Sequence, residues 1–141
     1  MNYLPTVINI ETVNRYCNAR CPMCTIKFSP EYSNVSKDEF SHNGILRKAE
    51  IMTLDNFKII IDKFKSIAGN ITALNLHGCG EPLLDKSLAD KVKYAKISGF
   101  TNVGFSSNCD ILTRETTESL LDSGLNCLIA SIDGLSKDVQ E

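Results

Sequence analysis

The chain has 141 residues, with 17 acidic and 15 basic side chains and a net charge of −2 at pH 7. This length suits one ordinary domain, and the balanced charge gives no footprint for nucleic acid. No apolar run approaches the ~20 residues of a membrane span, and residues 1–17 lack the basic and apolar regions of a secretory signal. We therefore expect a cytoplasmic protein, with no nucleic-acid or membrane partner, whose six cysteines are reduced or bind metal.

The first part of the chain predicts a strand, a long insertion and a helix. The β-branched run at residues 6–12 predicts the strand, and a cysteine-rich segment follows it at once. Residues 26–50 are polar, so we expect a solvated loop or a substrate-facing flap within the domain. Thr53 is expected to cap a helix that ends at residues 69–70. Its apolar side chains are expected to be core: Phe57, Ile60, Phe64 and Ile67.

Strands and helices then alternate. Residues 71–77 predict a second strand, and Leu88, Val92 and Ala95 lie on one face of a second helix that Gly99 stops. Residues 102–107 predict a third strand. Beyond it we expect a helix that Thr113 caps and Gly124 ends, and then a fourth strand over 127–133. Ser136 is expected to cap a fourth helix.

The run at 127–133 is continuously apolar, as in a strand that is buried on both faces. Four strands joined by helical crossovers predict an α/β fold with a parallel sheet, either open or part of a (β/α) barrel. In both architectures, ligands bind at the carboxyl ends of the strands.

The unusual residues fall at these strand ends. Three cysteines in the segment CNARCPMC (17–24) follow the first strand, and HGCGEP (77–82) follows the second. SSNC (106–109) follows the third, and Ser131 and Asp133 lie near the end of the fourth. One end of the sheet therefore collects the residues that a single site would need.

Three thiols in one short loop have a chemical explanation. Thiolates select iron–sulfur clusters and zinc, and a structural zinc site normally has four protein ligands. A cubane cluster held by Cys17, Cys21 and Cys24 would leave one iron open for a small-molecule chelate. The alternative is a structural zinc site completed by His42 or His77, in a binding module without catalysis. We favour a hydrogen bond to backbone for His77.

The motifs resemble those of the radical S-adenosylmethionine enzymes. CNARCPMC resembles the family's CxxxCxxC motif, and GCGEPLL (78–84) resembles its Gly-Glu-Pro motif. FSSN (105–108) and SIDG (131–134) resemble the segments that end its third and fourth strands. The resemblance covers residues 6–136 apart from the polar insertion.

The resemblance implies a 4Fe–4S cluster held by Cys17, Cys21 and Cys24, with S-adenosylmethionine on the fourth iron. The reduced cluster would cleave this cofactor to a 5′-deoxyadenosyl radical, which takes a hydrogen atom from the substrate. The resemblance identifies no catalytic residue, but it implies a set of residues that contact the cofactor: Met23, Gly78, Gly80, Glu81, Pro82, Asn108, Ser131 and Asp133.

The sequence departs from the family pattern in three respects. Met23 replaces the usual aromatic residue, and Cys109 replaces a common glycine, so the turn there is expected to differ. The family barrel has more strands than the four β/α units expected over residues 1–141. We therefore expect the N-terminal part of the core domain, which is not self-sufficient for catalysis and belongs to a longer polypeptide or pairs with a second chain. An inactive fragment is a further alternative.

The other expectations concern partners and the remaining cysteines. The motifs resemble members that modify peptides or carry a SPASM-like C-terminal extension, so the substrate is expected to be a peptide or else a small molecule. The electron donor is expected to resemble flavodoxin or ferredoxin. Cys79, Cys109 and Cys127 are expected to be small buried residues without a chemical role, and a simple turn role is an even alternative for Asn108.

Overall fold

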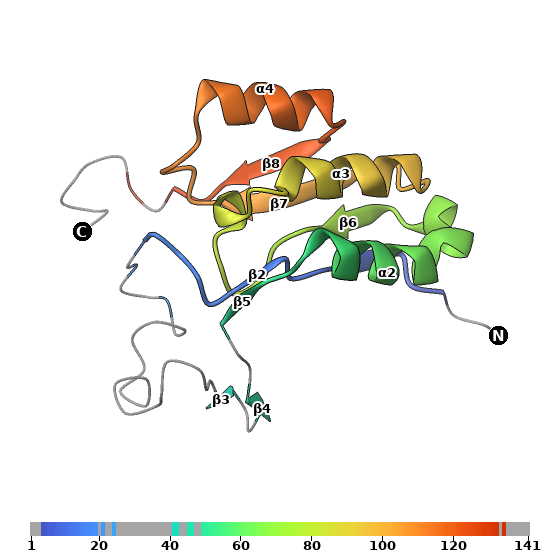
Figure 1. The fold of residues 1–141 in the computed structure, drawn as a ribbon, viewed down its shortest axis with the longest axis horizontal. Coiled ribbons are helices and arrows are strands. Elements are labelled where there is room, and N and C mark those ends of the chain that lie inside the picture. Colours follow the sequence, from blue (N-terminus) through green and yellow to red (C-terminus); the bar gives the residue numbers. More distant parts are fainter. Residues whose placement is uncertain are drawn as a thin grey trace.

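A computed structural model describes residues 4–19, 21, 24, 41–42, 45–46, 49–132 and 134, and for 41–42 and 45–46 it describes the backbone alone. Its centre is a sheet of four parallel strands in the order β1–β6–β7–β8 (Figure 1). The predicted parallel α/β fold is therefore confirmed. The strands are β1 (Val7–Asn9), β6 (Ala73–Asn75), β7 (Val103–Ser107) and β8 (Cys127–Ala130).

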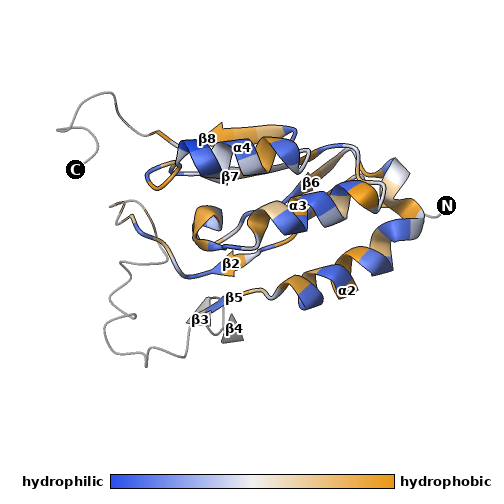
Figure 2. Ribbon diagram, turned by 45° about the horizontal axis from the view of Figure 1, so that its top comes forward, coloured by the Kyte–Doolittle hydropathy of each residue, from blue (hydrophilic) through white to orange (hydrophobic). Residues whose placement is uncertain are grey.

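Three helices lie side by side along the sheet: α2 (Leu54–Phe64), α3 (Leu88–Ile97) and α4 (Arg114–Asp122) (Figure 1). Figure 2 shows apolar and polar residues in alternating bands along α2, as an amphipathic helix requires. The helices and one face of the sheet enclose a single apolar core. Its members include Ile10, Phe57, Ile61, Leu74, Leu76, Val92, Phe100, Val103, Phe105 and Leu120.

The helix boundaries follow local chemistry. Thr53 caps α2, because its hydroxyl accepts the Asn56 N–H at 3.2 Å. Thr113 caps α4 in the same way through Thr116 N–H at 3.1 Å. Gly99 and Gly124 follow α3 and α4 with φ of +100° and +89°, a conformation that glycine adopts readily. These predicted caps and stops are confirmed.

The end of the first helix differs from the prediction. The α-helix ends at Phe64, and a 3₁₀ segment, η2 (Lys65–Asn70), continues it to the predicted end. The chain is thus helical up to the expected residues, but its last turns are more tightly wound.

The first strand is shorter than the predicted range 6–12, and a second short strand follows just beyond that range. β1 ends at Asn9, and a separate strand, β2 (Val13–Asn14), pairs antiparallel with β5 (Glu50–Ile51). Thr12 lies between the two strands and is fully buried, and its hydroxyl donates to the Leu76 carbonyl at 3.3 Å. The sequence pattern could not show this break, because the β-branched residues continue across it.

The fourth strand is less buried than predicted. β8 pairs with β7 on one side, and the structure describes no strand on its other side. Ile129 is 55% exposed, whereas Leu128 packs against the core. The expectation that this strand is buried on both faces is therefore wrong for the described chain, in which β8 lies at the edge of the sheet.

A buried ion pair joins α3 to the segment after the second motif. Lys91 is fully buried, and its ammonium donates to the Asp85 carboxylate and to the Met52 carbonyl. Asp85 also accepts the N–H and the hydroxyl of Ser87, at 2.9 and 2.7 Å. Because Met52 directly precedes the cap of α2, this pair links the starts of two helices.

The predicted insertion at 26–50 lies mostly outside the described residues, as does the predicted helix cap at Ser136. Within the insertion, β3 (Ser41–His42) pairs antiparallel with β4 (Ile45–Leu46). Among the described residues, no helix has the length and apolar character that crossing a membrane requires.

Candidate active site

The backbone after β2 is held against the Gly-Glu-Pro turn that follows β6. Arg15 N–H donates to the Cys79 carbonyl at 3.0 Å, and Glu81 N–H donates to the Tyr16 carbonyl at 2.8 Å. These two bonds fix the chain immediately before Cys17. The first and second motifs, which are far apart in the sequence, are therefore joined by backbone contacts.

The two glycines of this turn are required by the chain itself. A Cβ on Gly80 would lie 2.5 Å from the Val13 carbonyl oxygen and 2.9 Å from that of Tyr16. A Cβ on Gly78 would lie 2.7 Å from the side chain of Glu11. The two glycines thus allow the turn to lie close against the chain that leads to the cysteines.

Glu81 organises the strand ends from within the protein. Its side chain is 3% exposed, and one carboxylate oxygen accepts the Ser107 hydroxyl at 2.7 Å and the Leu83 N–H at 3.0 Å. The other oxygen accepts the Asn108 N–H at 3.0 Å. A buried carboxylate needs such donors. Glu81 therefore joins the second motif to the third.

Asn108 joins the third motif to the cysteine loop. Its amide nitrogen lies 3.8 Å from Cys17 Sγ and donates to Asn18 Oδ1 at 3.1 Å. Asn18 in turn donates to the Asp110 carboxylate at 3.0 Å. Asn108 also accepts the Asp110 N–H at 3.0 Å, so it forms a turn and a bridge at once.

Cys109 adopts a backbone conformation that glycine favours. Its φ is +60°, in the left-handed region that non-glycine residues rarely occupy. Its N–H donates to the Ser107 hydroxyl at 2.9 Å. Whether the turn differs from that of the family stays a prediction; Cys109 occupies it in a conformation that is strained for a non-glycine residue.

The cysteine triad is described at all three positions. Cys17, Cys21 and Cys24 are half-buried and form no disulfide, and Cys24 N–H donates to the Cys21 carbonyl at 3.0 Å. Within the described ranges, no three His, Cys, Asp or Glu side chains converge closely enough to hold a metal ion. The donor set itself, three thiols within one turn-forming segment, has the chemistry that an iron–sulfur cluster requires.

The predicted hydrogen bond of His77 is confirmed. Its Nδ1 accepts the Ser106 N–H at 3.1 Å, which continues the pairing of the second and third strands beyond their last ladder bond. This contact explains the histidine without a metal. The side chain of His42, the other suggested zinc ligand, lies outside the described residues.

The remaining predicted positions are distributed around the same end of the sheet. Pro82 is buried and begins η3 (Pro82–Leu84). Ser131 is exposed, and its N–H donates to the Ser107 carbonyl at 2.8 Å, which extends β8 along β7. Met23 and Asp133 lie outside the described residues. Of the other cysteines, Cys79 and Cys109 are half-buried, but Cys127 is exposed, so the expectation of burial is wrong for Cys127.

Sequence reasoning missed three residues that build this region. Ser107 is a buried polar residue on the same face of β7 as the apolar Val103 and Phe105. A polar residue on an otherwise apolar strand face could have been recognised in the sequence. Glu11 accepts the Cys79 N–H at 2.5 Å, and Asn18 bridges the loop to Asp110. Nothing in the local pattern distinguished these two from ordinary polar residues.

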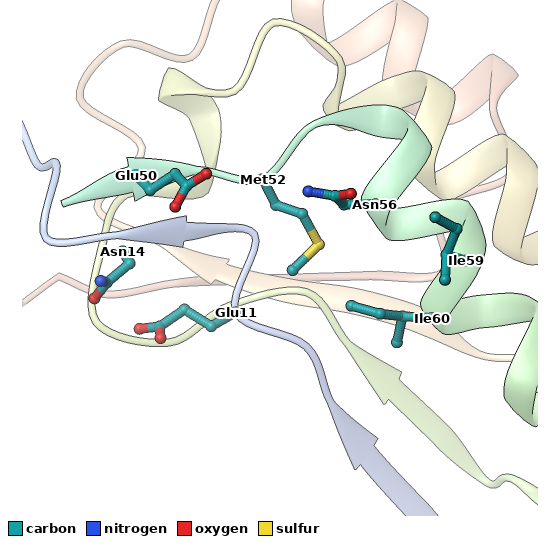
Figure 3. Close-up of a pocket in the computed structure, with 7 residues that line it drawn as sticks. All are labelled: Glu11, Asn14, Glu50, Met52, Asn56, Ile59 and Ile60. Atoms are coloured by element: carbon teal, nitrogen blue, oxygen red, sulfur yellow. The ribbon is translucent and has the colours of Figure 1, made fainter. Parts of the chain in front are cut away.

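A cavity of about 360 Å³ adjoins the site. Figure 3 shows Glu11, Asn14 and Glu50 toward one end and Ile59 and Ile60 toward the other. Because Glu11 also bonds to Cys79, the cavity and the Gly-Glu-Pro turn share a residue. Its volume is within the range of small-molecule sites, roughly 300–1,000 Å³.

Comparison with known proteins gives relatives of one kind. The chain is 29% identical over 123 residues to GTP 3′,8-cyclase of Clostridium perfringens. The aligned segment covers 86% of this chain and 33% of that protein. It is 26% identical over 123 residues to Fe-coproporphyrin III synthase of Methanosarcina barkeri, and this aligned segment covers 87% of this chain and 26% of that protein. The chain thus spans between a quarter and a third of the length of these curated relatives.

Solved structures agree on the fold. BtrN in complex with AdoMet and 2-DOIA matches with a TM-score of 0.70 and 23% identity, over 92% of this chain and 46% of that one. BtrN in an open conformation matches with a TM-score of 0.69 and 20% identity, over 99% and 56%.

The structure shows an α/β fold with a parallel four-stranded sheet, and the three-cysteine segment begins shortly after β2. The family model of the radical SAM superfamily matches residues 12–141, and the chain belongs to this superfamily. The relatives named above are themselves enzymes, a cyclase and a synthase.

Proposed function

We propose that this chain binds a 4Fe–4S cluster through Cys17, Cys21 and Cys24 and binds S-adenosylmethionine at the iron that they leave open. Bound together, these groups supply reductive cleavage to a 5′-deoxyadenosyl radical for hydrogen abstraction from a substrate. Superfamily membership supports both cofactors in general terms. The residues of this chain hold, orient and enclose them.

One observation carries the proposal: the segment leading to Cys17 is fixed on two sides by the turns that follow β6 and β7. Glu81 and Cys79 bind its backbone, and Asn108 approaches the thiol itself. Because metal binding is commonly coupled to local folding, we propose that Cys21 and Cys24 join Cys17 when the cluster forms.

The cofactor contacts remain those that the motifs imply. We propose that backbone groups of Gly78 and Gly80 and the exposed Ser131 contact S-adenosylmethionine, together with Met23 and Asp133. The structure favours a supporting role for Glu81, Pro82 and Asn108 over direct contact with the cofactor. Glu81 and Pro82 are buried, and the Asn108 N–H donates to the Glu81 carboxylate, which also accepts the Ser107 hydroxyl. We propose that these three residues hold the strand ends that form the cofactor site and do not contact the cofactor themselves.

The substrate proposed is a small molecule, with a peptide as the alternative. Relatives carry names that refer to GTP and to a coproporphyrin, and the cavity beside Glu11 has the size and mixed polarity of a small-molecule site. We propose a cytoplasmic location and an electron donor of the flavodoxin or ferredoxin type, because six cysteines without a disulfide and a reducible cluster suit a reducing compartment.

Metal content of single cysteine variants tests the proposal. Cys17→Ala, Cys21→Ala and Cys24→Ala should each lose bound iron and sulfide after anaerobic reconstitution, whereas the exposed Cys127→Ala should retain both. The wild-type protein should be brown. A colourless protein that binds zinc, or full cluster retention in Cys21→Ala, would contradict the proposal.

A further inference from the structure

We propose that Asn108 tunes the cluster by donating an N–H···S hydrogen bond to Cys17, and that it acts as a positioning residue through this thiolate. The inference rests on the proposed cluster. The observation behind it is the 3.8 Å separation between the Asn108 amide nitrogen and Cys17 Sγ. Asn108 comes from the end of β7, so the donor and the thiol belong to different motifs.

The hydrogen-bond network fixes the orientation of this amide. Asn108 Oδ1 accepts the N–H of Asp110 at 3.0 Å, and a backbone N–H can only donate. The NH₂ group must therefore occupy the other position, where its two hydrogens meet Cys17 Sγ and Asn18 Oδ1. An exchanged amide would place an oxygen against a thiolate and against another oxygen.

The backbone of Asn108 is held as firmly as its side chain. Its N–H donates to the buried Glu81 carboxylate at 3.0 Å, and Glu81 also holds the neighbouring Ser107. A donor on so constrained a turn loses little entropy on bonding to the sulfur. The residue is half-buried, so water competes only partly for the amide.

Hydrogen bonds to cluster sulfurs influence the reduction potential. Reduction adds negative charge to the cluster and its thiolates, and an N–H donor stabilises the more negative state. Loss of the Asn108 amide should therefore shift the midpoint potential to a more negative value. The radical-forming step depends on the reduced cluster, so Asn108 would set how readily the electron donor can load it.

The test compares two neutral variants in the reconstituted protein. Asn108→Ser removes the amide but keeps a side-chain oxygen that can accept the Asp110 N–H, as serine does in similar turns. The control, Asn18→Ser, removes the other partner of the amide and leaves the bond to Cys17 in place. Midpoint potentials are measured by redox titration of the cluster signal, after iron and sulfide have been counted.

We expect a more negative potential in Asn108→Ser and a potential close to wild type in Asn18→Ser. Asn108→Asp, which replaces the donor with a carboxylate oxygen, should shift the potential further in the same direction and serves if Asn108→Ser does not assemble. An unchanged potential in the Asn108 variants, or an equal shift in Asn18→Ser, overturns the inference.

Two assembly outcomes are also decisive. If both Asn108 variants lose the cluster while Asn18→Ser retains it, Asn108 is needed for assembly and the tuning role is overturned. If the wild-type protein binds no iron and sulfide, the proposed function fails and this inference fails with it. Failure of the inference alone is recognised by a fully loaded wild-type cluster and an unmoved potential.

Discussion

The buried carboxylate of Glu81 accepts the hydroxyl of Ser107 at 2.7 Å, and this bond joins the turn after β6 to the end of β7. With the bonds from Leu83 and Asn108, three donors converge on one side chain that is 3% exposed. The motif glutamate is thus part of the scaffold on which the cysteine loop rests.

Removing this carboxylate should destabilise the fold. Glu81→Ala would leave Ser107 and two backbone N–H groups buried without an acceptor, at a cost of about 3 kcal/mol in the free energy of unfolding. Glu81→Gln keeps one acceptor and the shape, so it should cost clearly less. Urea denaturation monitored by circular dichroism measures both. An alanine variant within about 0.5 kcal/mol of wild type would contradict this role.

Gly80→Ala should destabilise the protein without any cofactor present. The added Cβ would meet the Val13 carbonyl at 2.5 Å, and backbone there cannot move aside cheaply. We expect a loss of at least about 2 kcal/mol. Gly69→Ala is the matched control, since a Cβ there meets nothing within 4 Å. Equal stability of the two variants would show that the glycine is not a packing requirement.

Cys109→Gly should stabilise the protein. A side chain in the left-handed region costs about 1–2 kcal/mol, and the greater freedom of glycine in the unfolded chain returns part of the gain. The net gain expected is about 0.5–1 kcal/mol. Cys109→Ala, which removes the thiol but keeps the strain, should show no such gain. If the alanine variant gains as much, the thiol and not the backbone is responsible.

Lys91→Met should be among the most harmful single changes. It leaves the Asp85 carboxylate buried without its cation, at a cost of about 3–5 kcal/mol. Adding Asp85→Asn should restore part of the loss, because the amide oxygen can still accept from Ser87. Denaturation of the two single variants and the double variant gives the coupling. A strictly additive double variant would rule out the ion pair as the cause.

The order of elements was predictable because each depends on local signals. Thr53 and Thr113 indicate where helices start, and Gly99 and Gly124 indicate where helices end. The alternation of strands and helices, and therefore a parallel sheet, could be predicted from these local signals. The break between β1 and β2 was not predictable, because it depends on pairing with Glu50 and Ile51 across a long insertion. Exposure of β8 likewise depends on which strands surround it.

The position of the site was predictable from the sequence, but its hydrogen bonds and packing contacts were not. The motif residues identified the carboxyl ends of the strands, where the structure brings Cys17, Glu81 and Asn108 together. The sequence did not show that the glycines of the second motif make room for the chain itself, Gly80 for Val13 and Tyr16 and Gly78 for Glu11. Such contacts are decided by three-dimensional proximity, which one sequence does not record.

The central claim is that three thiols leave one iron open for S-adenosylmethionine. The most direct measurement is the electron paramagnetic resonance spectrum of the reduced, reconstituted protein before and after S-adenosylmethionine is added. The account predicts a changed signal in the wild type and the same change in Cys127→Ala, whose thiol is exposed at the start of β8. A fully loaded cluster with an unchanged spectrum would contradict the claim.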